Sequence, residues 1–318
     1  MTRASIILLV SAGLLLSISA NAQEAINNTK SDDHKQVIGT GFFLVPPPGF
    51  SSATNFQGFQ QESSGGSIIL TVLPAPFSEI SGTLTAEAFL AGGMELQTSE
   101  DVKVNGDQGY FITLKQNAYG ITFSKYMLVF GDEETIYMVT GSFPLEAEET
   151  GKNIRRSMFS VVYEKDLMVD PLASAPFSIN TDNTKLKFAQ NMSGSFLYTV
   201  DGKVPTESND KTSLFIGMSY SKIQPLNMKA TALQRINTLP YDKIDVDESS
   251  INKIEIGGIS GYEIIGEGLD NTTGESELIY QAMLFSNDDY FIILGTTNND
   301  QEENLDLFKR ITNTFRKN

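Results

Sequence analysis

The chain has 318 residues, 39 acidic against 23 basic side chains and a formal net charge of −16, with one histidine and no cysteine. The lack of cysteine excludes disulfides, thiol catalysis and a lipid anchor on a thiol, and with a single histidine it also excludes the usual zinc sites. The acidic balance argues against nucleic acid and anionic membranes as partners, because both bind clustered basic side chains. Solubility is the simplest explanation of the excess acid, and a basic partner or cation binding is the alternative.

The first 22 residues have the three parts of an export signal. Arg3 precedes an apolar run over 6–16, and Ala20-Asn21-Ala22 fits a small-x-small cleavage site. A membrane anchor is the alternative, but the run is shorter than the roughly 20 residues needed to span. We predict a cleaved signal peptide over residues 1–22, a mature protein that is secreted or periplasmic, and no membrane span in the rest of the chain.

The first half of the mature chain alternates strand and helix patterns after an irregular start. Residues 23–36 show no apolar periodicity and are predicted to be a flexible tail. The elements predicted after it are a strand at 67–74, a helix at 85–96 capped by Thr85, two strands around an acidic turn at 126–141, and a closing helix with Ile154, Met158 and Val161 on one face.

The second half repeats this plan. Residues 164–176 contain two prolines and are predicted to link a first unit at 37–163 to a second at 177–318. The elements predicted in the second unit are a strand at 213–220, a helix at 227–239 capped by Asn227, two strands around an acidic turn at 280–295, and a closing helix with Phe308, Ile311 and Phe315 on one face.

A Gly-x-x-Gly-Tyr corner occurs once in each unit, at Gly106 and again at Gly258. Alternating apolar residues flank both corners, and glycine allows the positive φ that a tight hairpin requires. A ligand-cradling loop is the alternative, but no helix start follows either corner to hold a phosphate. A fixed offset across several elements indicates an internal duplication.

This order of elements resembles the PsbP-like (Mog-like) superfamily. The segments that carry the resemblance are "FFLVPPPGF" (42–50), "VKVNGDQGYFITL" (102–114), "KYMLVFGDEETIYMVTGSFP" (125–144), "KIEIGGISGYEII" (253–265), "YQAMLFSNDDYFIILG" (280–295) and "LDLFKRITNTF" (305–315). The resemblance implies an α+β fold of two tandem α/β/α sandwich domains, each a mainly antiparallel sheet flanked by helices. It also implies a non-enzymatic role in binding other proteins, and no functional residue of the family maps onto this chain.

The residues that could carry chemistry are few. His34, the only histidine, falls in the predicted tail, where a solvated side chain is expected. Two Ser-x-x-Lys matches, at Ser208 and Ser250, fall in a polar loop and before a strand, outside the buried helix start that a serine acyl enzyme requires. The acidic turns supply oxygen ligands without the spacing of a dedicated calcium loop. We therefore predict no catalytic residue, no metal ligand and no cofactor.

Phe56 and Phe59 form the one unusual aromatic pair. Residues three apart face opposite sides of a regular strand, but Gly58 could mark a bulge that returns both rings to the core. The alternative leaves one ring exposed as a contact for a partner. Phe56 and Phe59 are therefore the candidate partner surface.

Three functions remain open from the sequence. The leading interpretation is a secreted or periplasmic, non-enzymatic binding or accessory protein whose partner is another envelope or extracellular protein. A hydrolase that acts on a secreted polymer through paired carboxylates is the second, and it requires two acids facing each other in a deep pocket. A small-ligand carrier is the third, and it requires an enclosed apolar cavity.

Overall fold

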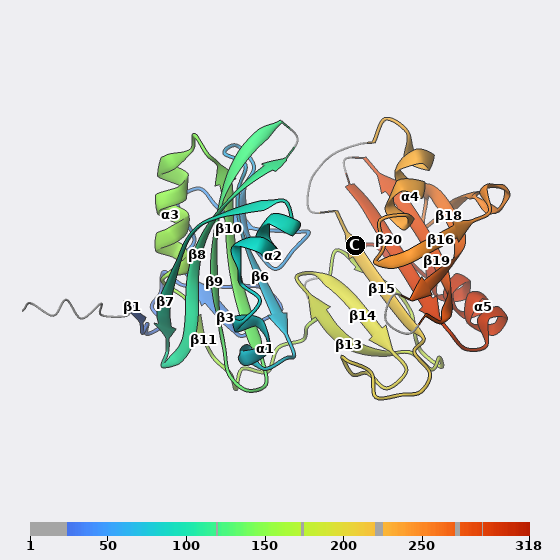
Figure 1. Cartoon of the computed structure of the whole chain (residues 1–318), viewed down its shortest axis with the longest axis horizontal. Helices are drawn as coiled ribbons and strands as arrows, with labels where there is room; N and C mark the ends of the chain where they lie inside the picture. Colours follow the sequence, from blue (N-terminus) through green and yellow to red (C-terminus); the bar gives the residue numbers. More distant parts are fainter. Residues whose placement is uncertain (1–23, 119, 173–174, 220–224, 271–273, 288) are drawn as a thin grey trace, which may run out of the picture.

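The computed structural model describes residues 24–118, 120–172, 175–219, 225–270, 274–287 and 289–318. The predicted signal peptide at 1–22 lies outside the described residues. Within them, each half of the chain forms its own eight-stranded sheet (Figure 1), the first coloured blue to green and the second yellow to red.

The first sheet has the strand order β1-β7-β8-β9-β10-β6-β5-β4, and all its pairs are antiparallel except β1 with β7. Its strands are β1 (Glu24–Ile26), β4 (Ser51–Ser52), β5 (Gly58–Gln61), β6 (Gly66–Leu73), β7 (Met94–Val104), β8 (Asp107–Ala118), β9 (Ile121–Gly131) and β10 (Ile136–Pro144). A small sheet of β2 (Lys35–Gln36), β3 (Phe42–Leu44) and β11 (Val162–Tyr163) adds Phe42 and Leu44 to the same core.

Helices cover both faces of the first sheet (Figure 1). Because side chains alternate along a strand, Leu128 and Phe130 of β9 pack under α3 (Glu148–Met158), while Val129 packs on the other face under α1 (Phe77–Ser81). The third helix, α2 (Ala86–Ala91), buries Phe89 on that same face. The sheet therefore has an apolar core on each side.

The second sheet has the order β13-β14-β15-β20-β19-β18-β16, with β17 also paired to β18. Its elements are β13 (Lys187–Met192), β14 (Ser195–Thr199), β15 (Ser213–Met218), α4 (Met228–Ile236), β16 (Tyr241–Val246), the short 3-10 helix η1 (Glu248–Ser250), β17 (Asn252–Ile256), β18 (Ile259–Asp270), β19 (Ser276–Ser286), β20 (Asp289–Thr297) and α5 (Gln301–Thr312). A pair of strands, β12 (Phe177–Ser178) and β21 (Arg316–Lys317), joins the two ends of this half.

The two sheets have corresponding strand orders. Starting from the edge strand β4 or β13, each sheet runs through three strands in chain order, then through the last long strand, the one before it and the one before that. The predicted N-caps are also present, because the side chains of Thr85 and Asn227 accept from the backbone of Ala88 and Ala230. The two halves therefore share one order of long strands.

The repeated glycine corner is a structural hairpin in both sheets. Gly106 and Gly258 have φ of 95° and 78° in the turns that lead into β8 and β18. The second glycines, Gly109 and Gly261, touch the neighbouring strand so closely that a β-carbon would collide with the carbonyl oxygens of Val129 and Met283. The corner therefore sets the register of the strands and the distance between them, and this explains why glycine occupies both positions.

The predicted fold class is wrong in its balance. Strands make up 46% of the residues that the structure describes and helices 16%, so this part of the protein is mostly β instead of an α+β fold of two balanced sandwiches. The reason is the length of the elements. The strands β7 to β9 have 11 or 12 residues each, whereas α1 and α2, on the sheet face opposite α3, have 5 and 6. The helix predicted over 85–96 ends at Ala91, because Gly93 leaves helical geometry with φ of 72° and β7 begins at Met94.

The predicted flexible tail is also corrected. Residues 24–26 form β1, which pairs with the edge of β7, and residues 35–36 form β2. Ile26 is 4% exposed and belongs to the first core. A segment without apolar periodicity is ordered here because one isoleucine enters the first core and polar side chains bond to the carbonyls that follow α3.

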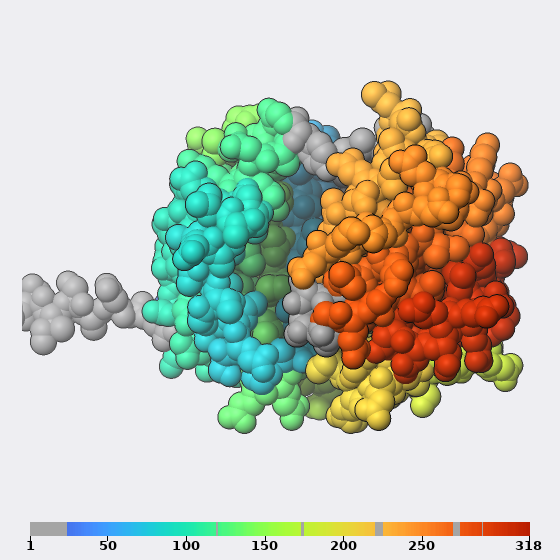
Figure 2. Space-filling view, turned by 45° about the vertical axis from the view of Figure 1, so that its right-hand side comes forward, coloured from blue at the N-terminus to red at the C-terminus, as the bar shows by residue number. Residues whose placement is uncertain are grey.

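Polar contacts join the two halves. The hairpin between β13 and β14 places Ser193 against β6, where its Oγ donates to the carbonyl of Leu70 at 2.7 Å and lies 2.7 Å from Oγ1 of Thr71. Gln190 of the same hairpin donates to the carbonyl of Val72 at 2.7 Å. Figure 2 shows the two halves as separate lobes with a hollow between them on the face drawn. The hairpin thus bonds to β6 beyond the stretch that pairs with β5.

Candidate functional site

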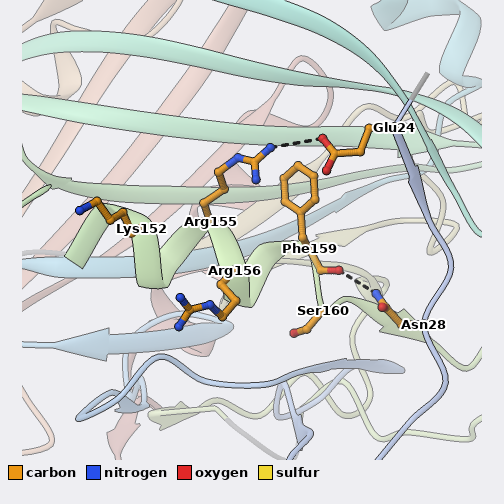
Figure 3. A pocket seen from close by; sticks show the side chains of 7 residues that line it. All are labelled: Glu24, Asn28, Lys152, Arg155, Arg156, Phe159 and Ser160. Atoms are coloured by element: carbon orange, nitrogen blue, oxygen red, sulfur yellow. Dashed lines mark hydrogen bonds and ion pairs between the residues drawn. The ribbon is translucent and has the colours of Figure 1, made fainter. Parts of the chain in front are cut away.

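A groove of about 600 Å³ runs along the outward side of α3 (Figure 3). It forms where the N-terminal segment after β1 passes the last turns of the helix. The residues that line it are Glu24, Asn28, Lys152, Arg155, Arg156, Phe159 and Ser160. Three of these side chains are cations and one is a carboxylate, in a chain whose formal net charge is −16.

The amphipathic pattern of α3 aims these cations outward. Ile154 and Met158 are fully buried against the sheet, so Lys152, Arg155 and Arg156 occupy the remaining side of the helix. The two arginines lie in the last helical turn, where positive charge interacts favourably with the helix dipole. Helix stability alone therefore favours arginine here. The groove additionally places these charges beside the N-terminal segment that carries Glu24 and Asn28.

Arg155 is held in a defined position. Its Nη2 donates to Oε2 of Glu24 at 3.2 Å, and its guanidinium lies 4.1 Å from the ring of Phe159 and 5.1 Å from the ring of Phe111. Cations over aromatic faces are attracted by the ring electrons. Burial raises the pKa of the neighbouring Tyr126, and the positive charge of Arg155 opposes that rise.

The other two cations have weaker partners. Lys152 lies 3.4 Å from Glu149 with both side chains largely exposed, and ion pairs of that kind contribute little to stability. Arg156 donates to Oδ1 of Asn153 at 3.2 Å, and in Figure 3 it extends away from Glu24. Both cations are therefore available to a ligand at low energetic cost.

The opposite wall is fixed by neutral hydrogen bonds. The Asn28 side-chain amide donates to the carbonyls of Phe159 at 2.8 Å and Val161 at 3.0 Å, just after the end of α3. His34, predicted to be a solvated tail residue, instead places Nε2 2.9 Å from the carbonyl of Ser160 and Nδ1 next to Ser31. These bonds hold the N-terminal segment against the helix.

The predicted aromatic pair lies elsewhere. Phe59 is 2% exposed within the first core. Phe56 precedes β5 and is also buried, and its backbone lies against Gly194 of the β13–β14 hairpin. At Gly58 a β-carbon would collide with the carbonyl oxygen of Ile68. The close backbone contact at Gly58 accounts for the burial of Phe59, and the contact between the two halves accounts for the burial of Phe56.

A second, smaller cavity of about 310 Å³ lies beside α5 in the second half. Its lining is balanced in charge, with Lys185 and Arg310 against Glu303 and Asp306. The buried Asn304 donates from Nδ2 toward two threonine hydroxyls and one carbonyl, which makes this cavity polar. Arg155 and Arg156 of α3 correspond to Lys309 and Arg310 of α5, but Lys309 faces Glu263 of β18 at 3.5 Å.

Two further observations bear on chemistry and topology. The described part of the chain contains no group of three or more acidic, histidine or cysteine side chains arranged to hold a metal ion. None of its helices combines the length and the apolar character required to cross a bilayer.

No protein-family model matches the chain, and no curated protein matches it either. The PsbP-like resemblance therefore stays a prediction. Similar solved structures do exist, and they include bacterial proteins of envelope biogenesis and T6SS immunity.

Three of these structures illustrate the likeness. LpqN, involved in cell envelope biogenesis of Mycobacterium tuberculosis, is 14% identical over 44% of this chain and 82% of its own, with a TM-score of 0.32. The T6SS immunity protein TplEi from Pseudomonas aeruginosa is 11% identical over 89% of this chain and 96% of its own, with a TM-score of 0.30. A chain of the Tle4-Tli4 complex is 11% identical over 91% of this chain and 99% of its own, with a TM-score of 0.31. Likeness at this level assigns no function to the chain.

Proposed function

We propose that this chain is an exported, non-enzymatic binding protein that recognises an anionic group on another envelope or extracellular protein through the α3 groove. The observation that carries the proposal is the charge of the groove, in which Lys152, Arg155 and Arg156 face the single carboxylate of Glu24 while the chain as a whole is acidic. A cationic groove on an acidic protein attracts anionic partners selectively.

The character of the groove supports a macromolecular partner. It is an open groove beside a helix, and its lining includes a guanidinium that lies over an aromatic ring. Arginine and aromatic side chains are enriched where protein interfaces concentrate their binding energy. A hydrolase would require two facing carboxylates, whereas the groove offers only Glu24, which is already paired with Arg155.

We further propose that the chain works as two units joined by residues 164–176, with the first unit extended to Glu24 by the observed β1. The separate sheets and their matching strand orders support this division. In this arrangement the first unit carries the anion-binding groove, and the second unit presents a charge-balanced surface at the corresponding helix.

The test uses the mature chain from Gln23 and a fluorescent hexaglutamate peptide, with hexalysine as the opposite charge. We expect anisotropy to show binding of hexaglutamate that weakens as salt is raised. The double variant Arg155→Gln/Arg156→Gln should weaken it by about tenfold or more, since each tenfold change corresponds to about 1.4 kcal/mol.

The duplication supplies a matched control. Lys309→Gln/Arg310→Gln removes the same charge from the corresponding positions of α5. We expect it to change hexaglutamate binding by less than about twofold, as surface substitutions away from a site do. Equal losses in the two double variants, or no binding of hexaglutamate at low salt, would refute the proposed function.

A further inference from the structure

The N-terminal strand β1 occupies the edge of the first sheet as an added strand. It has three residues and runs parallel to β7, with Glu24, Ala25 and Ile26 opposite Val102, Lys103 and Val104. The carbonyl of Ile26 accepts the backbone N–H of Asn105 at 2.8 Å. Strand addition of this kind is a general way for a sheet edge to bind an extended peptide.

Each of the three residues of β1 has different surroundings. The carboxylate of Glu24 meets Arg155 in the groove, Ala25 is exposed, and Ile26 is buried in the first core. Asn28 then bonds to the two carbonyls that follow α3. The groove and the sheet edge together therefore hold an acidic residue and, two positions later, an aliphatic residue in an extended segment.

The hold on β1 is modest. A single side chain, Ile26, is buried, and both partners of the ion pair are more than two-fifths exposed, at 42% for Arg155 and 48% for Glu24. Terminal segments with few buried contacts open at low free-energy cost. Along the rest of β7, from Met94 to Asp101, the described chain pairs only with β8, so the edge continues beyond β1.

We infer that β1 is an intramolecular stand-in for a partner, and that the α3 groove and the edge of β7 together bind an extended acidic segment of another protein. The segment carries a carboxylate residue followed two positions later by an aliphatic residue. It displaces β1, places its carboxylate on Arg155 and adds in parallel to β7. This inference rests on the proposed function, because it names the partner of the same groove.

The test uses a labelled peptide with the sequence QEAINN, which repeats residues 23–28, and the full mature chain. In the variant Ile26→Asp the chain's own strand competes poorly, so we expect the peptide to bind at least about tenfold more tightly than to the unaltered chain. Adding Arg155→Gln to Ile26→Asp should abolish most of that gain. The control peptides QQAINN and QEASNN, which lack the carboxylate and the aliphatic side chain, should bind at least about tenfold more weakly than QEAINN.

A second variant guards against unfolding of Ile26→Asp. Glu24→Ala removes only the half-exposed carboxylate, and we expect it to raise peptide affinity in the same direction by a smaller factor. Unchanged affinity in both variants, or a gain that survives Arg155→Gln, would overturn the inference. A dimer seen by light scattering in place of peptide binding would also overturn it, because the occupant would then be a second copy. If hexaglutamate binds and QEAINN does not, only this inference fails and the proposed function stands.

Discussion

Glu24 and Arg155 lie 131 residues apart in the sequence and meet at 3.2 Å between Oε2 and Nη2. The pair joins the first described strand to the last turn of α3, with both side chains nearly half exposed. An ion pair in this setting contributes little to the stability of the fold but fixes the position of the Arg155 guanidinium. The contact therefore matters more for recognition than for stability.

The first prediction separates these two roles. Glu24→Gln should lower the free energy of unfolding by less than about 1 kcal/mol, since exposed ion pairs are weak. Ile26→Ala should lower it by about 2 kcal/mol or more, because it removes buried methyl groups and leaves a cavity. Urea unfolding followed by circular dichroism measures both. A cost for Glu24→Gln as large as that for Ile26→Ala would contradict the view that Ile26 anchors the strand.

The second prediction concerns pH and the turn before β10. The Lys165 ammonium and the backbone N–H groups of Glu134 and Thr135 lower the pKa of Asp132 from 3.8 to about 2. A depressed folded-state pKa stabilises the fold above the unfolded value, and this stabilisation is lost as pH falls from about 4 toward 2.

Asp132→Asn should therefore be less stable than the unaltered chain at pH 6 and should approach it in stability near pH 2. Lys165→Gln keeps the backbone bonds and should remove only part of the effect. Denaturant midpoints measured at pH 6, 4, 3 and 2 give the comparison. A stability difference between the aspartate and asparagine chains that does not change with pH would rule out this assignment.

The third prediction tests the duplicated corner. Gly109→Ala and Gly261→Ala should each destabilise the chain by about 1–3 kcal/mol, because the new β-carbon must displace a neighbouring strand. Gly82→Ala is the matched control, since Gly82 has an ordinary φ of −80° and open space around it. We expect its effect to stay within about 0.5 kcal/mol. Thermal unfolding of the three variants decides the matter, and similar values for all three would count against strand approach as the cause.

The fourth prediction concerns the contact between the halves. A double-mutant cycle of Thr71→Val and Ser193→Ala should give a coupling energy of about 0.5–3 kcal/mol, because the two hydroxyls bond across the contact and Ser193 is buried. The control cycle uses Thr98 of β7 and Thr113 of β8, whose hydroxyls lie 2.8 Å apart in an exposed contact. Exposed bonds exchange with water, so we expect a coupling below about 0.5 kcal/mol there. Additive effects of Thr71→Val and Ser193→Ala would show that the bond does not couple the halves.

Local patterns predicted the parts of the fold that depend on local chemistry. The caps at Thr85 and Asn227 are confirmed, and the faces marked by Ile154 and Phe308 are the buried ones. The balance of strand and helix was not predictable in this way, because strand lengths are decided by pairing with distant neighbours. The ordering of residues 24–36 depends on β7 and on the end of α3, which no local pattern of that segment reveals.

The groove could not be predicted from the sequence for the same reason. Arg155 and Arg156 alone match an ordinary exposed helix end, where basic residues are favourable. What distinguishes them is Glu24 and Asn28 on the other wall, brought there by a segment that was expected to be flexible. The one local signal was the concentration of three basic residues within two turns of helix in an acidic chain.

The position of β1 also affects how a newly made chain matures. Residues 24–26 leave the ribosome early, but their helix partner Arg155 is synthesised 131 residues later. At about 5–20 residues per second, the 131 residues between them take roughly 7–26 s to synthesise, so residues 24–26 wait that long for Arg155. During that interval β1 cannot form its ion pair with α3, so completion of this edge of the first sheet waits for the helix.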